Sequence, residues 1–203
     1  MLTAISQHSS LYLLKLNKRR KGKRRLPARV KQPLEQAGML NQSWSMDFMS
    51  DSLVCGRKFR TLNVIDDYNR EALAIEVDTS LSARRVIRVL ERAIEVHGKP
   101  VTIRVDNGPE FTSKDFELWC KDKSITIQFI QPGRPMQNGF IERFNGSYRK
   151  EILDAYAFFE LYEVRELTKE WIEEYNTNRP HESLGNLTPK EWKQQFQNQT
   201  LSK

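Results

Sequence analysis

The sequence has few of the residues that cross-link a chain or span a membrane. It contains only two cysteines in 203 residues, Cys55 and Cys120, with no histidine at metal-ligand spacing. This argues against a disulfide framework and a zinc module and favours a reducing compartment. No uncharged apolar run approaches the roughly 18 residues that a membrane span needs, and the first 14 residues lack the cationic start of a secretory signal. We therefore expect a cytoplasmic protein with no membrane partner.

Acidic residues are absent from the first 34 positions. That stretch carries ten of the 33 Lys and Arg residues, and the rest of the chain has 23 basic against 26 acidic residues. The net charge of +7 therefore arises in one short basic arm, where a polyanion such as nucleic acid would bind first. Such runs are as often solvated tails, so the arm alone does not decide the function. The DNA contacts predicted in this arm are Lys18, Arg19, Arg20, Lys21, Lys23, Arg24 and Arg25.

Hydrophobic periodicity predicts three strands followed by alternating helices and strands. In the first strand, Trp44, Met46 and Phe48 face one side and the intervening residues face the other. The expected strands are 44–49, 59–65, 72–77, 101–105 and 125–130, the first three forming an antiparallel meander. Apolar residues at helical spacing predict helices over 83–94, around 116–120, over 141–152, over 164–178 and from residue 189. This order indicates a mixed sheet flanked by helices.

Two helix starts carry capping-box patterns. Thr112 with Asp115 would begin the helix that carries Phe116, and Thr188 with Glu191 would begin the last helix. In the last helix a proline also occupies the first helical position, where its missing N–H costs nothing.

Three carboxylates occupy places where a phosphoryl-transfer site would put them. Asp47 lies within the first strand, Asp106 follows the fourth, and Glu142 lies on the helix after a Gly- and Pro-rich break. An acid that leaves a buried strand is exposed at the carboxyl edge of the sheet, where open sheets bind ligands. Each carboxylate taken alone is more often a solvated or capping acid. Asp66 and Asp67 compete with Asp47, and we interpret them as turn residues.

Three stretches resemble the catalytic core of DDE transposases and retroviral-type integrases. They are residues 44–48 (WSMDF), 105–111 (VDNGPEF) and 131–145 (QPGRPMQNGFIERFN). Residues 175–189, with Arg179-Pro180-His181 and Thr188-Pro189, resemble more narrowly the second-frame (OrfB-type) protein of the bacterial IS-three insertion-sequence family. Three ordered motifs with a matching tail are far more specific than any one of them.

The resemblance implies an α/β protein with an RNase H-like fold, a mixed five-stranded sheet flanked by helices. In that fold Asp47, Asp106 and Glu142 would converge as catalytic and metal-binding residues around two Mg²⁺ ions, which Mn²⁺ would replace. Hard divalent cations prefer carboxylate oxygens, and they remove the repulsion among three clustered acids. On the helix of Glu142, Arg149 and Asn145 are candidate DNA contacts, and Asn145 is also a candidate for orienting the site.

By the same resemblance, the substrate is double-stranded DNA, namely the terminal inverted repeats of a mobile element and its target. A first reaction frees a 3′-hydroxyl at an element end, and a second joins that hydroxyl to another phosphodiester through a circular intermediate. Both ends must be held together, so we expect a homo-oligomer on DNA, associated with the nucleoid. A first-frame helix-turn-helix product is a further expected partner.

Family resemblance also divides the chain. Residues 1–37 form the basic arm, interpreted as the remnant of a missing helix-turn-helix region; residues 38–180 form the integrase core; and residues 181–203 form a tail with a short helix. Because that upstream region is missing, two alternatives stay open. One is a truncated or regulatory DNA-binding fragment without activity, and the other is a related RNase H-like nuclease or retroelement integrase.

Overall fold

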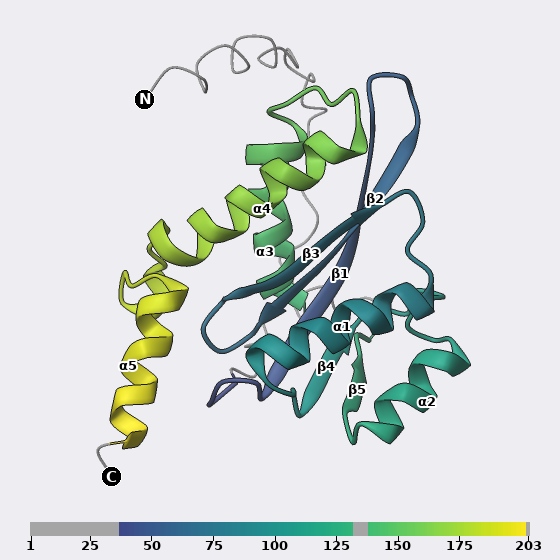
Figure 1. Cartoon of the computed structure of the whole chain (residues 1–203). Helices are drawn as coiled ribbons and strands as arrows, with labels where there is room; N and C mark the ends of the chain where they lie inside the picture. Colours follow the sequence, from purple (N-terminus) through teal and green to yellow (C-terminus); the bar gives the residue numbers. More distant parts are fainter. Residues whose placement is uncertain (1–36, 132–137, 202–203) are drawn as a thin grey trace, which may run out of the picture.

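The computed structural model describes residues 37–131 and 138–201. Five strands form one sheet: β1 (Ser43–Ser52), β2 (Lys58–Asp66), β3 (Ala72–Asp78), β4 (Thr102–Val105) and β5 (Thr126–Phe129). Their order is β3-β2-β1-β4-β5 (Figure 1). β1, β2 and β3 pair antiparallel, whereas β4 pairs parallel with β1 and β5. This mixed five-stranded sheet confirms the predicted fold class, with β1 at its centre.

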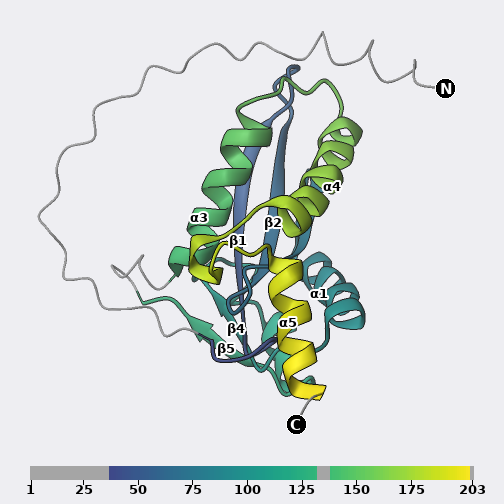
Figure 2. The same cartoon turned by 90° about the vertical axis from the view of Figure 1, so that its left-hand side faces the viewer.

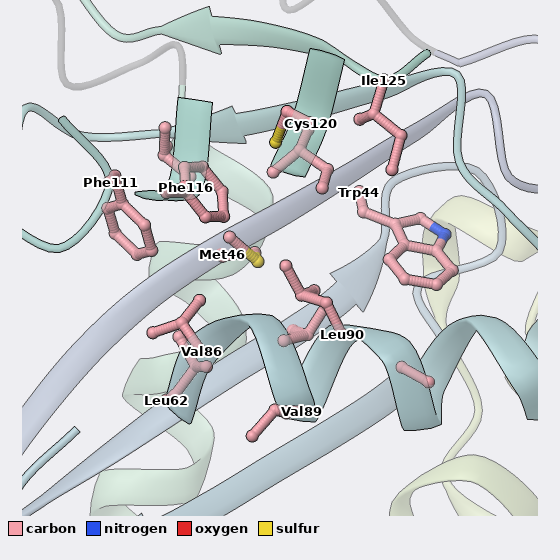
Figure 3. Packing of buried hydrophobic residues seen from close by; sticks show 14 of the residues in the cluster. Trp44, Met46, Leu62, Val86, Val89, Leu90, Phe111, Phe116, Cys120 and Ile125 are labelled. Atoms are coloured by element: carbon pink, nitrogen blue, oxygen red, sulfur yellow. The ribbon is translucent and has the colours of Figure 1, made fainter. Parts of the chain in front are cut away.

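One face of the sheet is covered by α1 (Ala83–His97) and α2 (Lys114–Asp122). Trp44 and Met46, two of the residues predicted to share a face of β1, are fully buried there against α1, as Figure 3 shows. Because side chains alternate along a strand, Ser45 and Asp47 point to the opposite face. Core packing on this side therefore fixes the direction in which the Asp47 carboxylate points.

The opposite face is covered by α3 (Gly139–Tyr148), a π-helical turn η2 (Arg149–Leu153) and α4 (Leu161–Asn178). Figure 2 shows α3 and α1 on opposite sides of the sheet. Phe144 and Tyr148 of α3 pack edge-on against Trp171 of α4, with ring centroids 5.3 and 5.1 Å apart. Tyr148 also shares a hydrogen bond of 2.6 Å with the Thr168 hydroxyl. These contacts hold α3 in place over the sheet.

Two expected helix starts have different outcomes. For α2 the prediction is wrong: Ser113, not Thr112, is the N-cap, and its hydroxyl accepts from the Phe116 backbone N–H. The Thr112 hydroxyl instead donates to the Gly108 carbonyl, which closes the preceding turn. For α5 (Pro189–Leu201) the box is confirmed, because Thr188 and Glu191 bond each other's backbone N–H.

The C-terminal part of the chain continues from α4 through a short 3₁₀ turn η3 (Glu182–Leu184) to α5. The division into arm, core and tail stays a prediction, and residues 1–36 of the arm lie outside the described residues. Within the described ranges, no helix is long and apolar enough to cross a membrane.

Candidate active site

Asp47 lies where β1 loses its neighbour on one side. The parallel ladder between β1 and β4 ends at the pair Ser45 and Arg104. Beyond that pair the Phe48 backbone N–H donates to Asp47 Oδ1 at 2.8 Å, while Asn145 Nδ2 donates to Asp47 Oδ2 at 2.8 Å. Both carboxylate oxygens are therefore held, one by the strand itself and one by α3.

A chain of amides ties α3 to the sheet at this point. Asn63 of β2 is fully buried directly opposite Asp47, and its Nδ2 donates to Asn145 Oδ1 at 2.6 Å. Since the Asp47 carboxylate only accepts hydrogen bonds, it fixes which end of the Asn145 amide faces it. Asn145 is buried and acts as a positioning residue between the two elements. The sequence gives no signal for the part played by Asn63, because nothing but the strand register places it there.

Asp106 follows the last residue of β4, and its carboxylate is held by the loop that it begins. The Gly108 backbone N–H donates to Asp106 Oδ1 at 2.9 Å. A Cβ atom at position 108 would lie only 2.9 Å from the same oxygen. A side chain at position 108 would therefore displace the Asp106 carboxylate from this hydrogen bond. Projecting the parallel register two residues past the pair Ser45 and Arg104 puts Asp106 level with Asp47 on the adjacent strand.

The rest of this loop is anchored to β1 and β2. Phe111 is fully buried and stacks on Phe48, with ring centroids 5.0 Å apart. Glu110 forms an ion pair with Arg60, whose guanidinium carbon lies 4.1 Å from the centroid of the Phe48 ring. Because Phe48 neighbours Asp47, these contacts fix the Asp106 loop relative to the Asp47 strand.

Glu142 lies in the first turn of α3, three residues before Asn145 and so on the same side of the helix. Its side chain is exposed. The pKa of Asp47 is raised to about 6, chiefly by burial and then by the negative charges of Asp106 and Glu142, against the lowering effect of the Phe48 and Asn145 hydrogen bonds. The carboxylates of Asp106 and Glu142 therefore both lie within electrostatic reach of Asp47.

The three acids provide the type of ligand that a divalent cation prefers. Three carboxylates supply the hard oxygen donors that Mg²⁺ prefers, and a cation would relieve their mutual repulsion. In the described part of the chain, however, no three His, Cys, Asp or Glu side chains are close enough together to hold a metal ion as they stand. Asp106 and Glu142 are exposed to solvent, whereas Asp47 is partly buried. The donor chemistry and the electrostatics fit the ion.

The competing acids Asp66 and Asp67 are buried and have structural partners. Asp66 ends β2 and accepts from the backbone N–H groups of Asn41 and Tyr68 at 2.7 and 2.8 Å. Asp67 lies in the turn and pairs with Arg104 at 3.1 Å, with both side chains buried. Both acids therefore stabilise the turn after β2. Asp67 lies in this turn, as predicted, whereas Asp66 is the last residue of β2. The sequence does not predict the Asp67–Arg104 pair. Its one indication is an arginine within a short buried strand.

The predicted DNA contacts have separate outcomes. Arg149 is half-buried, donates to the Ser50 carbonyl at 2.9 Å and lies 3.6 Å from Asp51. The DNA contacts of Arg149 and Asn145 stay predictions. The orienting role expected of Asn145 agrees with its hydrogen bond to Asp47. The basic-arm residues Lys18, Arg19, Arg20, Lys21, Lys23, Arg24 and Arg25 lie outside the described residues.

The chain is similar to proteins of known family. Two family models, each described as an integrase core domain, match residues 39–135 and 123–189. A 39.2 kDa protein of insertion element IS476 from Xanthomonas euvesicatoria is 41% identical over 186 residues, which cover 92% of this chain and 53% of that protein. A 31.7 kDa protein of insertion element IS407 from Burkholderia multivorans is 40% identical over 174 residues, covering 86% and 63%. The chain thus spans between half and two thirds of these relatives.

Among solved structures, the magnesium complex of the HTLV-2 integrase catalytic core domain in its trimeric form has a similar fold. The TM-score is 0.62 at 18% identity, and the match covers 76% of this chain and 97% of that one. At this identity the similarity concerns the fold, and it confirms the RNase H-like class expected from the sequence.

Proposed function

The chain belongs to the integrase core domain family, and on that basis we propose that it catalyses DNA strand cleavage and strand transfer at the ends of an insertion element. The observation that carries this proposal is the placement of Asp47, level with Asp106 past the end of the β1–β4 ladder and hydrogen-bonded to Asn145, one turn from Glu142 on α3. Burial first, and then the charges of Asp106 and Glu142, raise the pKa of Asp47. Three acids from β1, the end of β4 and α3 are costly to bring together unless a cation is bound among them. The insertion-element relatives support DNA as the substrate.

Asp47, Asp106 and Glu142 are the residues that would hold two Mg²⁺ ions. Magnesium in the similar HTLV-2 core supports this choice of ion, and Mn²⁺ is expected to replace it. When bound, such a pair supplies Lewis-acid stabilisation of the attacking and leaving oxygens.

The protein residues prepare the carboxylates for this role. Asn145 and the Phe48 N–H hold the Asp47 oxygens, and the Gly108 N–H holds Asp106. These hydrogen bonds form before substrate binds and orient Asp47 and Asp106 in advance, while the exposed Glu142 side chain is left to adjust when a cation binds.

The proposed reaction has two steps that balance without a covalent protein intermediate. Water first attacks a phosphodiester at an element end, the bond from phosphorus to the 3′-oxygen breaks, and a 3′-hydroxyl and a 5′-phosphate result. That hydroxyl then attacks the phosphorus of a second phosphodiester. A new bond forms between this phosphorus and the attacking 3′-oxygen, the bond to its former 3′-oxygen breaks, and the proton lost by the attacking hydroxyl is balanced by one that the leaving 3′-oxygen takes from solvent.

Labelled duplexes bearing the terminal sequences of the insertion element test this proposal. The chain is incubated with them in Mg²⁺ or Mn²⁺, beside Asp106→Asn. Asp122→Asn, the same change at an exposed carboxylate at the end of α2, is the matched control. Strand-transfer products that Asp106→Asn loses and Asp122→Asn keeps would support the proposal. Random nicking would favour a nuclease, and binding without products would favour a regulatory fragment; either result contradicts it.

We also propose that the chain acts as an oligomer on DNA, since strand transfer joins two ends. The trimeric form of the similar HTLV-2 core supports this. Light scattering after size exclusion, with and without end duplexes, should show at least a dimer on DNA. A strict monomer in both samples would reject it.

A further inference from the structure

Several cationic side chains surround a cavity beside α3, on a face of this helix that does not carry Glu142 and Asn145. The cavity has a volume of about 140 Å³ and lies between α3, the turn after β2 and the segment that follows α4. Arg143 and Ser147, one turn apart on α3, line it. Helical geometry places them on a different side of the helix from Glu142 and Asn145. Its remaining polar lining residues are Arg70, Arg179, His181 and Ser183.

Arg70 is the innermost of these cations. Its residue is only 8% exposed, and it has a left-handed backbone with φ of 62°, a conformation that costs energy for a residue with a side chain. The guanidinium carbon lies 3.4 Å from the centroid of the Phe140 ring, which holds the group in place. Nη1 of Arg70 is buried and has no hydrogen-bond partner among the described residues. A buried charged donor left in this state is destabilising.

The carboxylates of Asp66 and Asp67 attract the Arg70 charge, but Nη1 still has no hydrogen-bond partner among the described residues. Asp66 accepts from backbone N–H groups, and Asp67 Oδ2 accepts from Ser43 and Arg104. Glu151 pairs with Arg179 at one side of the cavity. Arg143 is exposed and forms no ion pair within residues 37–131 and 138–201.

His181 adds a further unused group. Its Nε2 atom is buried and has no partner among the described residues, and its ring packs edge-on against Tyr175 at 5.1 Å. Burial and the charges of Arg179, Arg70 and Arg143 lower the pKa of His181 to about 4, so the imidazole is neutral at pH 7. The lining of the cavity therefore combines three arginines, two serine hydroxyls and a neutral imidazole, a set suited to an anion.

We propose that this cavity binds a backbone phosphodiester of DNA, and that Arg70 and Arg143 contact its oxygens. The planar guanidinium fork matches the oxygens of a phosphate group. A volume of about 140 Å³ equals that of roughly four or five water molecules, room for one phosphate group rather than a base pair. Because α3 also carries Glu142, a strand seated here would be positioned beside the carboxylates. The inference rests on the proposed function in one respect, that DNA is the substrate.

The salt dependence of DNA binding tests the contact without any chemistry. The full chain is titrated with an unphosphorylated 20-base-pair duplex in EDTA over a range of salt concentrations. Each phosphate contact contributes about 0.9 to the slope of log affinity against log salt, so Arg143→Gln should lower the slope by about that amount. Arg88→Gln, which removes an exposed arginine on α1 across the sheet, is the matched control and should leave the slope unchanged.

A second measurement reports on the cavity itself. The Nε–H resonance of Arg70 is followed by NMR during titration with dimethyl phosphate, with inorganic phosphate, or with sodium chloride at equal ionic strength. A saturable shift with dimethyl phosphate, weakened in Arg143→Gln and kept in Arg88→Gln, would support a phosphodiester site. A shift with inorganic phosphate alone would mean that the cavity takes a free or terminal phosphate, and no shift beyond that with chloride would mean no anion site. Both results overturn the proposal.

Neither measurement contains a divalent cation. If strand transfer fails but these slopes and shifts appear, the proposed activity is wrong and the DNA contact stands. If strand transfer succeeds and Arg143→Gln binds as the wild type does, only the contact is wrong.

Discussion

Asp47 should destabilise the metal-free protein at neutral pH. Its pKa rises from the ordinary value of 3.8 to about 6 in the folded chain, first because of burial and then because of Asp106 and Glu142. Between these two values the folded state binds more protons than the unfolded state, so the free energy of unfolding falls as pH rises. The shift corresponds to about 3 kcal/mol in full, of which roughly 2 kcal/mol should appear between pH 4 and pH 7.5.

The variant Asp47→Asn isolates this effect, because an amide cannot ionise. Urea denaturation in EDTA gives the free energy of unfolding of both proteins at each pH. The difference between variant and wild type should grow by about 2 kcal/mol in favour of the variant from pH 4 to pH 7.5. Hydrogen bonds that the amide fails to replace contribute equally at both pH values and cancel. Asp122→Asn controls for the loss of one exposed charge.

A difference between Asp47→Asn and wild type that stays constant over this pH range would refute the reasoning. It would mean that Asp47 is not held in a desolvated place beside two other carboxylates.

Three further changes test other parts of the structure. Gly108→Ala places a methyl group 2.9 Å from Asp106 Oδ1. It should reduce strand transfer at least tenfold, a barrier change of about 1.4 kcal/mol, with little change in the urea midpoint. Full activity would contradict the positioning role of Gly108. Arg104→Ala leaves the buried Asp67 carboxylate unpaired and should cost about 3–5 kcal/mol of unfolding free energy; a loss below about 1 kcal/mol would show that the pair is not structural. Thr188→Ala removes one half of a capping box and should cost about 1 kcal/mol in urea denaturation, so an unchanged midpoint would contradict that role.

Patterns that depend on neighbouring residues could be read from the sequence. The alternation around Met46 placed Asp47 on the correct side of β1, and the strands and helices form in the predicted order. The α5 capping box is as local, because Thr188 and Glu191 satisfy each other. Helix ends are harder to predict. The Thr112 hydroxyl is used by the Gly108 carbonyl, and this turn is formed only once the Asp106 loop has folded.

Contacts between distant segments could not be predicted in the same way. Asn63 meets Asn145 across 82 positions and Arg104 meets Asp67 across 37, and only the sheet register and the placement of α3 bring them together. The type of helix after residue 148 could not be predicted either. The helix predicted over 141–152 continues from Arg149 as the π-helical turn η2 rather than as an α-helix. Apolar spacing alone does not distinguish the two.

The Arg70 cavity illustrates the same limit at a surface. An arginine in a turn looks solvated in the sequence, yet here it is buried against Phe140 with a donor atom unused. Its significance depends on Arg143 and on the segment after α4, which the fold brings alongside.

Anomalous diffraction from crystals grown with Mn²⁺ and an end duplex would test the central claim most directly. We predict two manganese peaks in contact with carboxylate oxygens of Asp47, Asp106 and Glu142, with Asp47 touching both. Peaks that leave any one of these three side chains without a metal contact, or no peaks at saturating Mn²⁺, would contradict the account.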